Sequence, residues 1–314
     1  MATKQKLERR IASTQDMSSI VSTMKALAAV NVRIFGQARD AIEQYMDTVE
    51  RGLQVVLTSD HGEAPGAQVR GPRRPGGGTR PPRPTGGVPS VAGGGGVGLF
   101  VFGAVQGMCG QFNDHIADEA ADYAARFAGD AQVVAVGPRV GARLADRGFL
   151  VERSVDMSGS LESLPRVVDD CIVAMDQLRM RGTTRAVAFY NAEGGESSYE
   201  PHYELVLPIN EAWLGRIVRR SWPTRSLPAV VTPRADLLTA LTRQYLFASF
   251  YRAAAQSLSS ENAARLSSMQ SAESNIDERL DELRSAYNQQ RQQEITSELL
   301  DIVGGYTALE ESSR

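Results

Sequence analysis

One stretch of this chain restricts its fold more than any other: Ala235–Val303 contains neither glycine nor proline. A single α-helix of about 70 residues is roughly 100 Å long, which exceeds the diameter of a small domain. Small and apolar side chains recur along it at steps of three and four residues, and the other positions are mostly polar. The recurring residues are Leu237, Leu241, Tyr245, Ala248, Tyr251, Ala255, Leu258, Leu266, Met269, Ala272, Ile276, Leu280, Leu283 and Tyr287. This narrow stripe is typical of a coiled-coil helix, so the sequence calls for a partner helix.

The N-terminal segment supplies a candidate partner. Residues Lys4–Leu57 carry a similar apolar stripe, although Gly36 and Gly52 each weaken a helix by roughly 1 kcal/mol relative to alanine. Two terminal helices that flank a compact middle region can pair antiparallel as a stalk. The alternative is that each helix folds back separately on the middle domain.

The chain divides into five segments. The N-terminal helix occupies residues 1–58. Residues 59–96 are rich in glycine, proline and arginine, a composition that cannot bury enough apolar surface to fold, so we expect a disordered insert. Residues 97–210 are expected to form a Rossmann-like α/β domain with a mostly parallel sheet covered on both faces. An irregular connection at 211–234 then leads into the C-terminal coiled-coil helix and tail at 235–314.

The α/β assignment comes from apolar runs that alternate with helical patterns. The predicted strands are Val97–Val105, Gln132–Val136, Phe149–Val155, Arg185–Tyr190 and Tyr203–Pro208. The predicted helices between them are Phe112–Phe127, Pro138–Asp146 and Leu164–Arg181. Short connections between alternating strands and helices favour parallel strands.

Composition excludes several classes of protein. The formal net charge of −3 gives no sign of nucleic-acid binding through bulk charge. No apolar run approaches the roughly 20 residues that span a bilayer, and the N-terminus lacks the apolar core of a signal peptide. We therefore expect a cytoplasmic protein whose membrane association depends on partners. Cys109 and Cys171 lie in apolar surroundings and are expected to be buried free thiols.

The middle domain carries no recognisable catalytic motif. Gly103, Gly107 and Gly110 follow the first strand, but their spacing differs from the G-x-G-x-x-G of dinucleotide-binding folds. The sequence has no P-loop, no G-x-S-x-G elbow and no metal-ligand spacing among its histidines. We expect neither a catalytic site nor a cofactor. Two alternatives stay open: a nucleotide-binding α/β enzyme, and a coiled-coil scaffold with no rotary role.

Several motifs bear a resemblance to a known family. They are Met24–Ala29 in the first helix, Gly107–Asn113 after the first strand, and Ser260–Leu266, Tyr287–Gln292 and Ile302–Gly305 in the last helix. With the order of the segments, they make nearly the whole chain similar to the γ subunit of the F-type ATP synthase. That resemblance implies an antiparallel coiled coil of terminal helices with a Rossmann-like domain between them.

The resemblance also implies a function. The chain would be a non-catalytic central rotor stalk that couples ion translocation to ATP synthesis or hydrolysis in an α3β3 head. Its other partners would be the ε subunit and the ring of c subunits. The protein would lie peripherally at the cytoplasmic face of a bacterial cell membrane.

Individual contact residues follow from the resemblance alone. The positions that match contacts with loops of the β subunits are Met24, Lys25, Arg243, Arg291 and Gln292. The positions that match an apolar bearing at the helix end are Ile295, Leu299, Ile302 and Val303. For each polar position the alternative is an ordinary solvated helix face.

The chain also departs from the family pattern. Ser18–Thr23 stands where family members carry several lysines, and Gln244 and Gln289 replace expected basic residues. These departures indicate a divergent branch of the family, such as the alternative N-type ATPases of bacteria.

Overall fold

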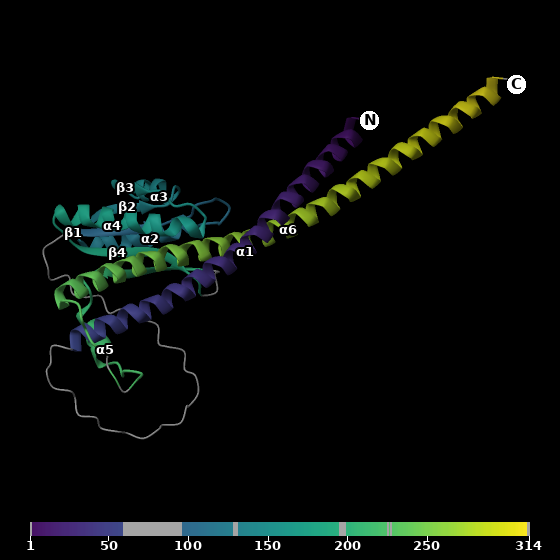
Figure 1. Cartoon of the computed structure of the whole chain (residues 1–314). Coiled ribbons are helices and arrows are strands. Elements are labelled where there is room, and N and C mark those ends of the chain that lie inside the picture. Colours follow the sequence, from purple (N-terminus) through teal and green to yellow (C-terminus); the bar gives the residue numbers. More distant parts are fainter. Residues whose placement is uncertain are drawn as a thin grey trace.

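The computed structural model describes residues 2–58, 96–127, 131–194, 199–224, 226 and 228–312. Two long helices, α1 (Ala2–Thr58) and α6 (Arg234–Ser312), cross the whole molecule, and a sheet domain packs against one end of the pair (Figure 1). The predicted disordered insert at 59–96 lies almost wholly outside the described residues. None of the described helices is long and apolar enough to cross a membrane.

The two long helices run antiparallel. Near the start of α1, Glu8 accepts a hydrogen bond from the hydroxyl of Tyr287, with 3.0 Å between the oxygens. Near the other end, the hydroxyl of Tyr45 donates to the side chain of Gln244. Partners of later α1 residues therefore lie earlier in α6, which confirms the predicted antiparallel coiled coil and excludes separate packing of each helix.

The described residues form one sheet in the order β3-β2-β1-β4-β5. Its strands are β1 (Gly96–Phe102), β2 (Ala131–Val136), β3 (Val151–Val155), β4 (Thr183–Ala192) and β5 (Glu200–Leu207). The pairs β1–β2, β2–β3 and β1–β4 are parallel, and β4–β5 is antiparallel. The predicted mostly parallel sheet is confirmed.

The first strand is shorter than predicted. It ends at Phe102, three residues before the expected end. The N–H groups of Ala104 and Val105 donate to the side chains of Asn113 and Glu261 in place of a neighbouring strand. An apolar run alone does not reveal this change of partner.

Helices cover both faces of the sheet (Figure 1). One face carries α2 (Phe112–Ala124), the short η1 (Ala125–Phe127) and α3 (Val140–Asp146), which enclose an apolar cluster with alternate residues of the strands. The other face carries α4 (Leu164–Met180), preceded by η2 (Leu161–Ser163), and α6, with α1 beside it. Burial on both faces explains why the strands read as continuous apolar runs.

The expected irregular connection contains a helix, α5 (Glu211–Arg219), so the prediction is wrong over these residues. Asn210 caps the helix by accepting a hydrogen bond from the N–H of Ala212 at 2.8 Å. The ring of Trp213 packs on Tyr245 of α6 at 4.8 Å between centroids. This aromatic contact stabilises α5. The helix is difficult to predict from the sequence because it is short and contains Gly215, which disfavours helix.

The middle of α6 is enclosed by the rest of the protein. From Ala253 to Arg265 every side chain except two is buried. Small residues dominate this segment, including three consecutive alanines and the serines at 257, 259 and 260. Their size lets the sheet, α4 and α1 approach α6 from different sides at once.

Gly103 lies where the chain leaves β1, at a close approach to α3. A Cβ atom there would be 2.3 Å from Val140 Cβ and 2.7 Å from Asn113 Oδ1. Gly103→Ala is therefore expected to lower the free energy of unfolding by about 1–3 kcal/mol in urea titrations. Gly36→Ala in α1 is the control, because its Cβ meets nothing within 4 Å and should stabilise the helix by roughly 1 kcal/mol. Equal stabilities of the two variants would contradict the prediction.

Candidate functional site

The last turns of α6 present apolar side chains on the surface. The exposed fractions of Ile295, Leu299, Ile302 and Val303 are 45%, 57%, 69% and 58%. Arg291 and Gln292 are exposed one turn earlier on the same helix. Contiguous exposed apolar surface of this kind marks a binding surface in soluble proteins. The assignment of these residues as a bearing and its polar neighbours stays a prediction.

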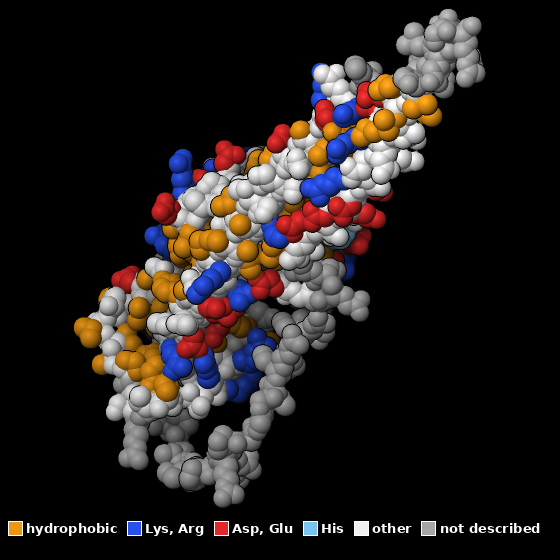
Figure 2. Space-filling view, turned by 90° about the vertical axis from the view of Figure 1, so that its right-hand side faces the viewer, with side chains coloured by type: hydrophobic (Ala, Val, Ile, Leu, Met, Phe, Trp, Pro, Cys, Tyr) orange, Lys and Arg blue, Asp and Glu red, His pale blue; other side chains and the backbone are white. Residues whose placement is uncertain are grey.

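A second apolar stripe runs along α1 on the side away from α6. It consists of Met17, Ile20, Leu27, Val30 and Ile34, whose exposed fractions are 56%, 60%, 60%, 56% and 39%. We call these five residues the outer stripe. Figure 2 shows hydrophobic side chains on the surface along the helical part of the molecule. The stalk therefore has apolar surface beyond what its own two helices cover.

Four residues of the outer stripe, Ile20, Leu27, Val30 and Ile34, were not predicted from the sequence, whereas Met17 was expected in the inner seam. The residues of the stripe follow one another at steps of three, seven, three and four, which is the same spacing that identified the inner seam. The inner seam of α1 includes Val21, Ala28 and Phe35, each one position after a residue of the stripe. Two apolar rows on one helix therefore mark two sides of α1, one that packs on α6 and one that is exposed.

The residues that were predicted to contact loops of the β subunits lie far apart. Met24 is half-buried against α6, and the ammonium of Lys25 pairs with the carboxylate of Glu273 on that helix. Arg243 is exposed near the start of α6, at the end that carries the sheet domain. Along a helix it is about 70 Å from Arg291, so one loop of a partner cannot contact both.

A buried polar cluster joins α6 to the turn that follows β1. The carboxylate of Glu261 accepts hydrogen bonds from the N–H groups of Val105 and Gln106 at 2.8 and 2.9 Å. Arg265 pairs with Glu261 and donates from Nε to the carbonyl of Gly107 at 3.2 Å. Glu261 and Arg265 are 1% and 4% exposed. We call these five residues the stalk joint.

The stalk joint fills the place where a doubly wound sheet binds its ligand. The strand order reverses beside β1, and in α/β sheets ligands enter the crevice outside the carboxyl ends of such strands. Here a carboxylate of α6 accepts the turn's N–H groups, which in nucleotide-binding folds face a phosphate. This occupancy argues against the nucleotide-binding alternative.

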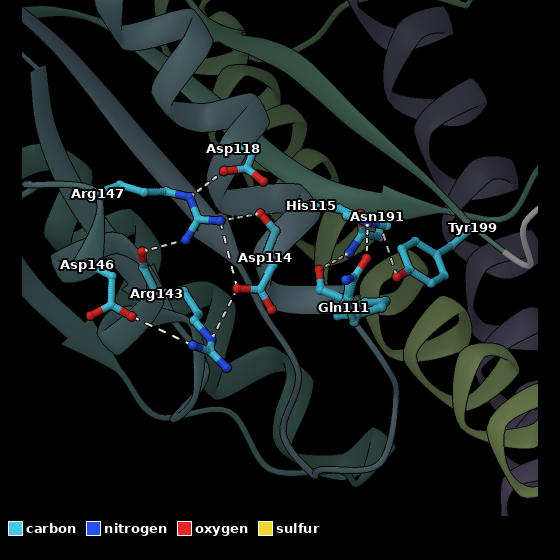
Figure 3. A network of polar contacts seen from close by, with 10 residues as sticks. Gln111, Asp114, His115, Asp118, Arg143, Asp146, Arg147, Asn191 and Tyr199 are labelled. Carbon is cyan, nitrogen blue, oxygen red and sulfur yellow. Dashed lines mark hydrogen bonds and ion pairs between the residues drawn. The ribbon is translucent and has the colours of Figure 1, made fainter. Parts of the chain in front are cut away.

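Arg143 of α3 and Arg147, the residue that follows this helix, form ion pairs with carboxylates of α2 (Figure 3). Arg147 pairs with Asp118, and Arg143 lies 3.3 Å from a carboxylate oxygen of Asp114. The hydrogen bond from Arg147 lowers the pKa of the Asp118 carboxyl group. The side chains of both pairs stay partly exposed to solvent, so each pair contributes little stability.

The start of α2 is tied to β4 and to the segment after it (Figure 3). The side-chain N–H of Asn191, which is fully buried, donates to the carbonyl of Phe112 at 2.9 Å. His115 lies within 3.1 Å of Gln111 and 3.3 Å of the Tyr199 hydroxyl. The turn that contributes to the stalk joint is thus held firmly at its other end.

Both cysteines are buried and free, as expected. Burial raises the pKa of the Cys109 thiol and that of the Cys171 thiol. Both groups therefore stay protonated at neutral pH, and the structure uses them as small apolar side chains.

Comparison with protein families adds a match along nearly the whole chain. A family model described as "ATP synthase" matches residues 3–309. The chain is 28% identical over 219 residues to the ATP synthase gamma chain of Solibacter usitatus, covering 68% of this chain and 72% of that one. It is 27% identical over 218 residues to the gamma chain of Nitrosomonas europaea, covering 68% and 74%.

Solved structures with a similar fold come from ATP synthases. A chain of the Euglena gracilis mitochondrial ATP synthase, solved with OSCP, F1 and c-ring, has a TM-score of 0.60 at 16% identity over 100% of this chain and 96% of that chain. A chain from the central stalk and c-ring of the Tetrahymena thermophila enzyme has a TM-score of 0.52 at 18% identity, over 81% and 99%. At these identities the likeness concerns the fold.

Proposed function

Because this chain belongs to the ATP synthase gamma-subunit family, we propose that it is the central rotor stalk of an F-type enzyme, turning within an α3β3 head. In this role it transmits rotation between an ion-translocating membrane ring and the catalytic head. It contributes no catalytic site and no cofactor, because the chemistry takes place in the head.

The observation that carries the proposal is the apolar outer surface of an antiparallel stalk. Two paired helices are stiffer than one, and a shaft that turns inside a sleeve needs a surface that is not bound to one position. Apolar contact has no preferred direction, so the outer stripe and the apolar end of α6 suit a bearing.

The partners follow from the family. They are the α3β3 head, the ε subunit and the ring of c subunits, with no role for nucleic acid. The protein would then lie at the cytoplasmic face of a bacterial membrane and be held there through these partners. We further propose that the chain belongs to a divergent branch of the family, such as the N-type ATPases, because Gln244 and Gln289 stand where the resemblance implies basic residues.

The proposal is tested by reconstitution with α3β3. We expect the purified chain to bind the head stoichiometrically and to stimulate its steady ATP hydrolysis, and fluorescent beads on the sheet domain should rotate. Failure to bind the head would exclude the rotor function. Binding without rotation would favour the scaffold.

The outer stripe is expected to contribute to this binding. Leu27→Ser with Val30→Ser removes two exposed apolar side chains, each worth roughly 1.5–3 kcal/mol if it is fully buried in the complex. We expect at least a tenfold lower affinity for α3β3 in titrations, with unchanged helicity. Leu150→Ser, at a leucine that is 79% exposed on the sheet domain, is the matched control. An unchanged affinity of the double variant would show that the stripe faces solvent in the complex.

A further inference from the structure

If the chain is a rotor, force must pass between the sheet domain and the stalk, and the following inference rests on that function. Helix α6 is continuous from the edge of the domain to the end of the stalk (Figure 1). A turning force on the domain therefore reaches the stalk end through the contacts that prevent α6 from moving against the sheet. Those contacts are concentrated in the enclosed segment from Ala253 to Arg265 and its flanks.

Apolar packing alone resists such movement weakly. The enclosed segment meets the sheet mainly through alanine and serine, which offer low ridges. Hydrophobic contact is proportional to area and has no direction, so a small rotation or shift changes it little. Hydrogen bonds weaken steeply when their angle changes, so polar links resist both movements.

Among the described residues, three polar links that involve a carboxylate connect α6 to the sheet domain. Glu204 on β5 pairs with Arg252, and Glu193, just after β4, accepts a hydrogen bond from the Ser259 hydroxyl. Burial alone would lower the pKa of Arg252, but the Glu204 carboxylate raises it. Glu193 also pairs with Arg39 of α1 at 2.8 Å. The third link is the stalk joint, where the turn after β1 meets Glu261.

The stalk joint differs from the other two links in burial and in the number of its bonds. Glu193 and Glu204 keep 36% and 20% of their side-chain surface exposed, whereas Glu261 keeps 2%. Glu261 binds two backbone groups and a guanidinium. Removing one partner would leave a buried charge uncompensated, which is strongly destabilising. The contacts of Glu261 are therefore expected to break together rather than one at a time.

The stalk joint also reaches the second helix of the stalk. The guanidinium of Arg265 donates to Oδ1 of Asn262 at 3.0 Å. The same oxygen accepts a hydrogen bond from Asn31 of α1 at 3.3 Å. One chain of polar contacts therefore runs from the backbone of the sheet domain through α6 to α1.

We propose that Glu261 and Arg265 are positioning residues that lock the sheet domain to both helices of the stalk, so that the domain and the stalk turn as one body. Glu261 fixes the turn after β1 to α6 through backbone bonds. Arg265 neutralises that carboxylate and extends the link to α1.

The lock is measured first in the isolated chain. Glu261→Gln keeps the shape of the side chain but leaves Arg265 buried without its counter-charge. Hydrogen exchange at the amides of Val105 and Gln106 is expected to accelerate roughly a hundredfold or more. The double variant Glu261→Gln, Arg265→Met removes both charges and should retain the global fold more fully than either single change. Glu162→Gln, at an exposed glutamate, is the matched control.

The decisive measurement is made in the complete membrane-bound complex. ATP hydrolysis and ATP-driven ion pumping are recorded on the same vesicles. We expect Glu261→Gln to lower the ratio of ions pumped to ATP hydrolysed severalfold while hydrolysis stays near that of the wild type, because the head still turns the stalk but the domain slips. Glu261→Asp, which keeps the charge, should recover part of the ratio. A merely structural role would lower assembly and leave the ratio in the assembled complexes unchanged.

The possible results distinguish a failure of the rotor function from a failure of the lock. A wild-type chain that neither binds the head nor supports pumping would overturn the rotor function together with the lock. A wild-type chain that pumps, combined with a Glu261→Gln complex of unchanged ratio, would overturn the lock alone. A lowered ratio with partial recovery in Glu261→Asp supports it.

Discussion

Phe250→Ala is expected to lower the free energy of unfolding by about 3–5 kcal/mol. Phe250 is fully buried, and its ring lies 4.9 Å from that of Phe100 between centroids. It therefore connects α6 to the central strand of the sheet, and its truncation would leave a cavity between them. The loss is measured from urea titrations followed by circular dichroism.

The control for this change is Leu150→Ala. Leu150 is 79% exposed, so its truncation should change stability by a few tenths of a kcal/mol. If Phe250→Ala and Leu150→Ala unfold at the same urea concentration, the packing of α6 on the sheet is not what stabilises the domain.

Arg291→Ala is expected to lower coupled ATP synthesis and steady ATP hydrolysis in the assembled complex. The apolar end of α6 can slide within a sleeve, whereas a guanidinium forms a planar, directional pair with a carboxylate. In a rotor, Arg291 would hold the stalk against one β-subunit loop at a time. Truncating one partner of a partly desolvated pair costs roughly 2–5 kcal/mol.

The test needs complexes whose assembly is verified on native gels. Gln292→Ala should act in the same direction but more weakly, since a neutral hydrogen bond contributes about 0.5–1.5 kcal/mol. Arg166→Ala, at an exposed arginine of α4, controls for the loss of a surface charge. An Arg291→Ala complex that turns over like the wild type would show that Arg291 is a solvated surface residue.

Much of the fold was predictable because its signals are local and repeated. The stripe from Leu237 to Tyr287 recurs over many turns, and the apolar strands stand out between turn residues. Helix α5 was not predictable in the same way, because the contact between Trp213 and Tyr245 joins residues from separate elements. The early end of β1 has a similar cause, since Glu261 lies far away along the chain.

The candidate site was predictable only in part. The family resemblance pointed to the apolar residues at the end of α6, whereas the single seam predicted on α1 left out Ile20, Leu27, Val30 and Ile34. Lys25 is bound to Glu273 within the stalk, which no residue spacing reveals. Glu261 and Arg265 have the i, i+4 spacing of an ordinary surface pair, and their burial becomes visible only when the sheet is placed against α6.

Along the sequence, the sheet domain lies between the two stalk helices, and this order has a consequence for folding. Lys25 and Glu273 are 248 positions apart, so at 5–20 residues per second a ribosome needs roughly 10–50 s to supply the partner. During that time the apolar seam of α1 has no α6 to cover it. The domain's strands and helices are complete before α6 emerges, and they lie ready as the surface on which it settles. Synthesis of the stalk therefore begins before that of the domain, with α1, and ends after it, with α6.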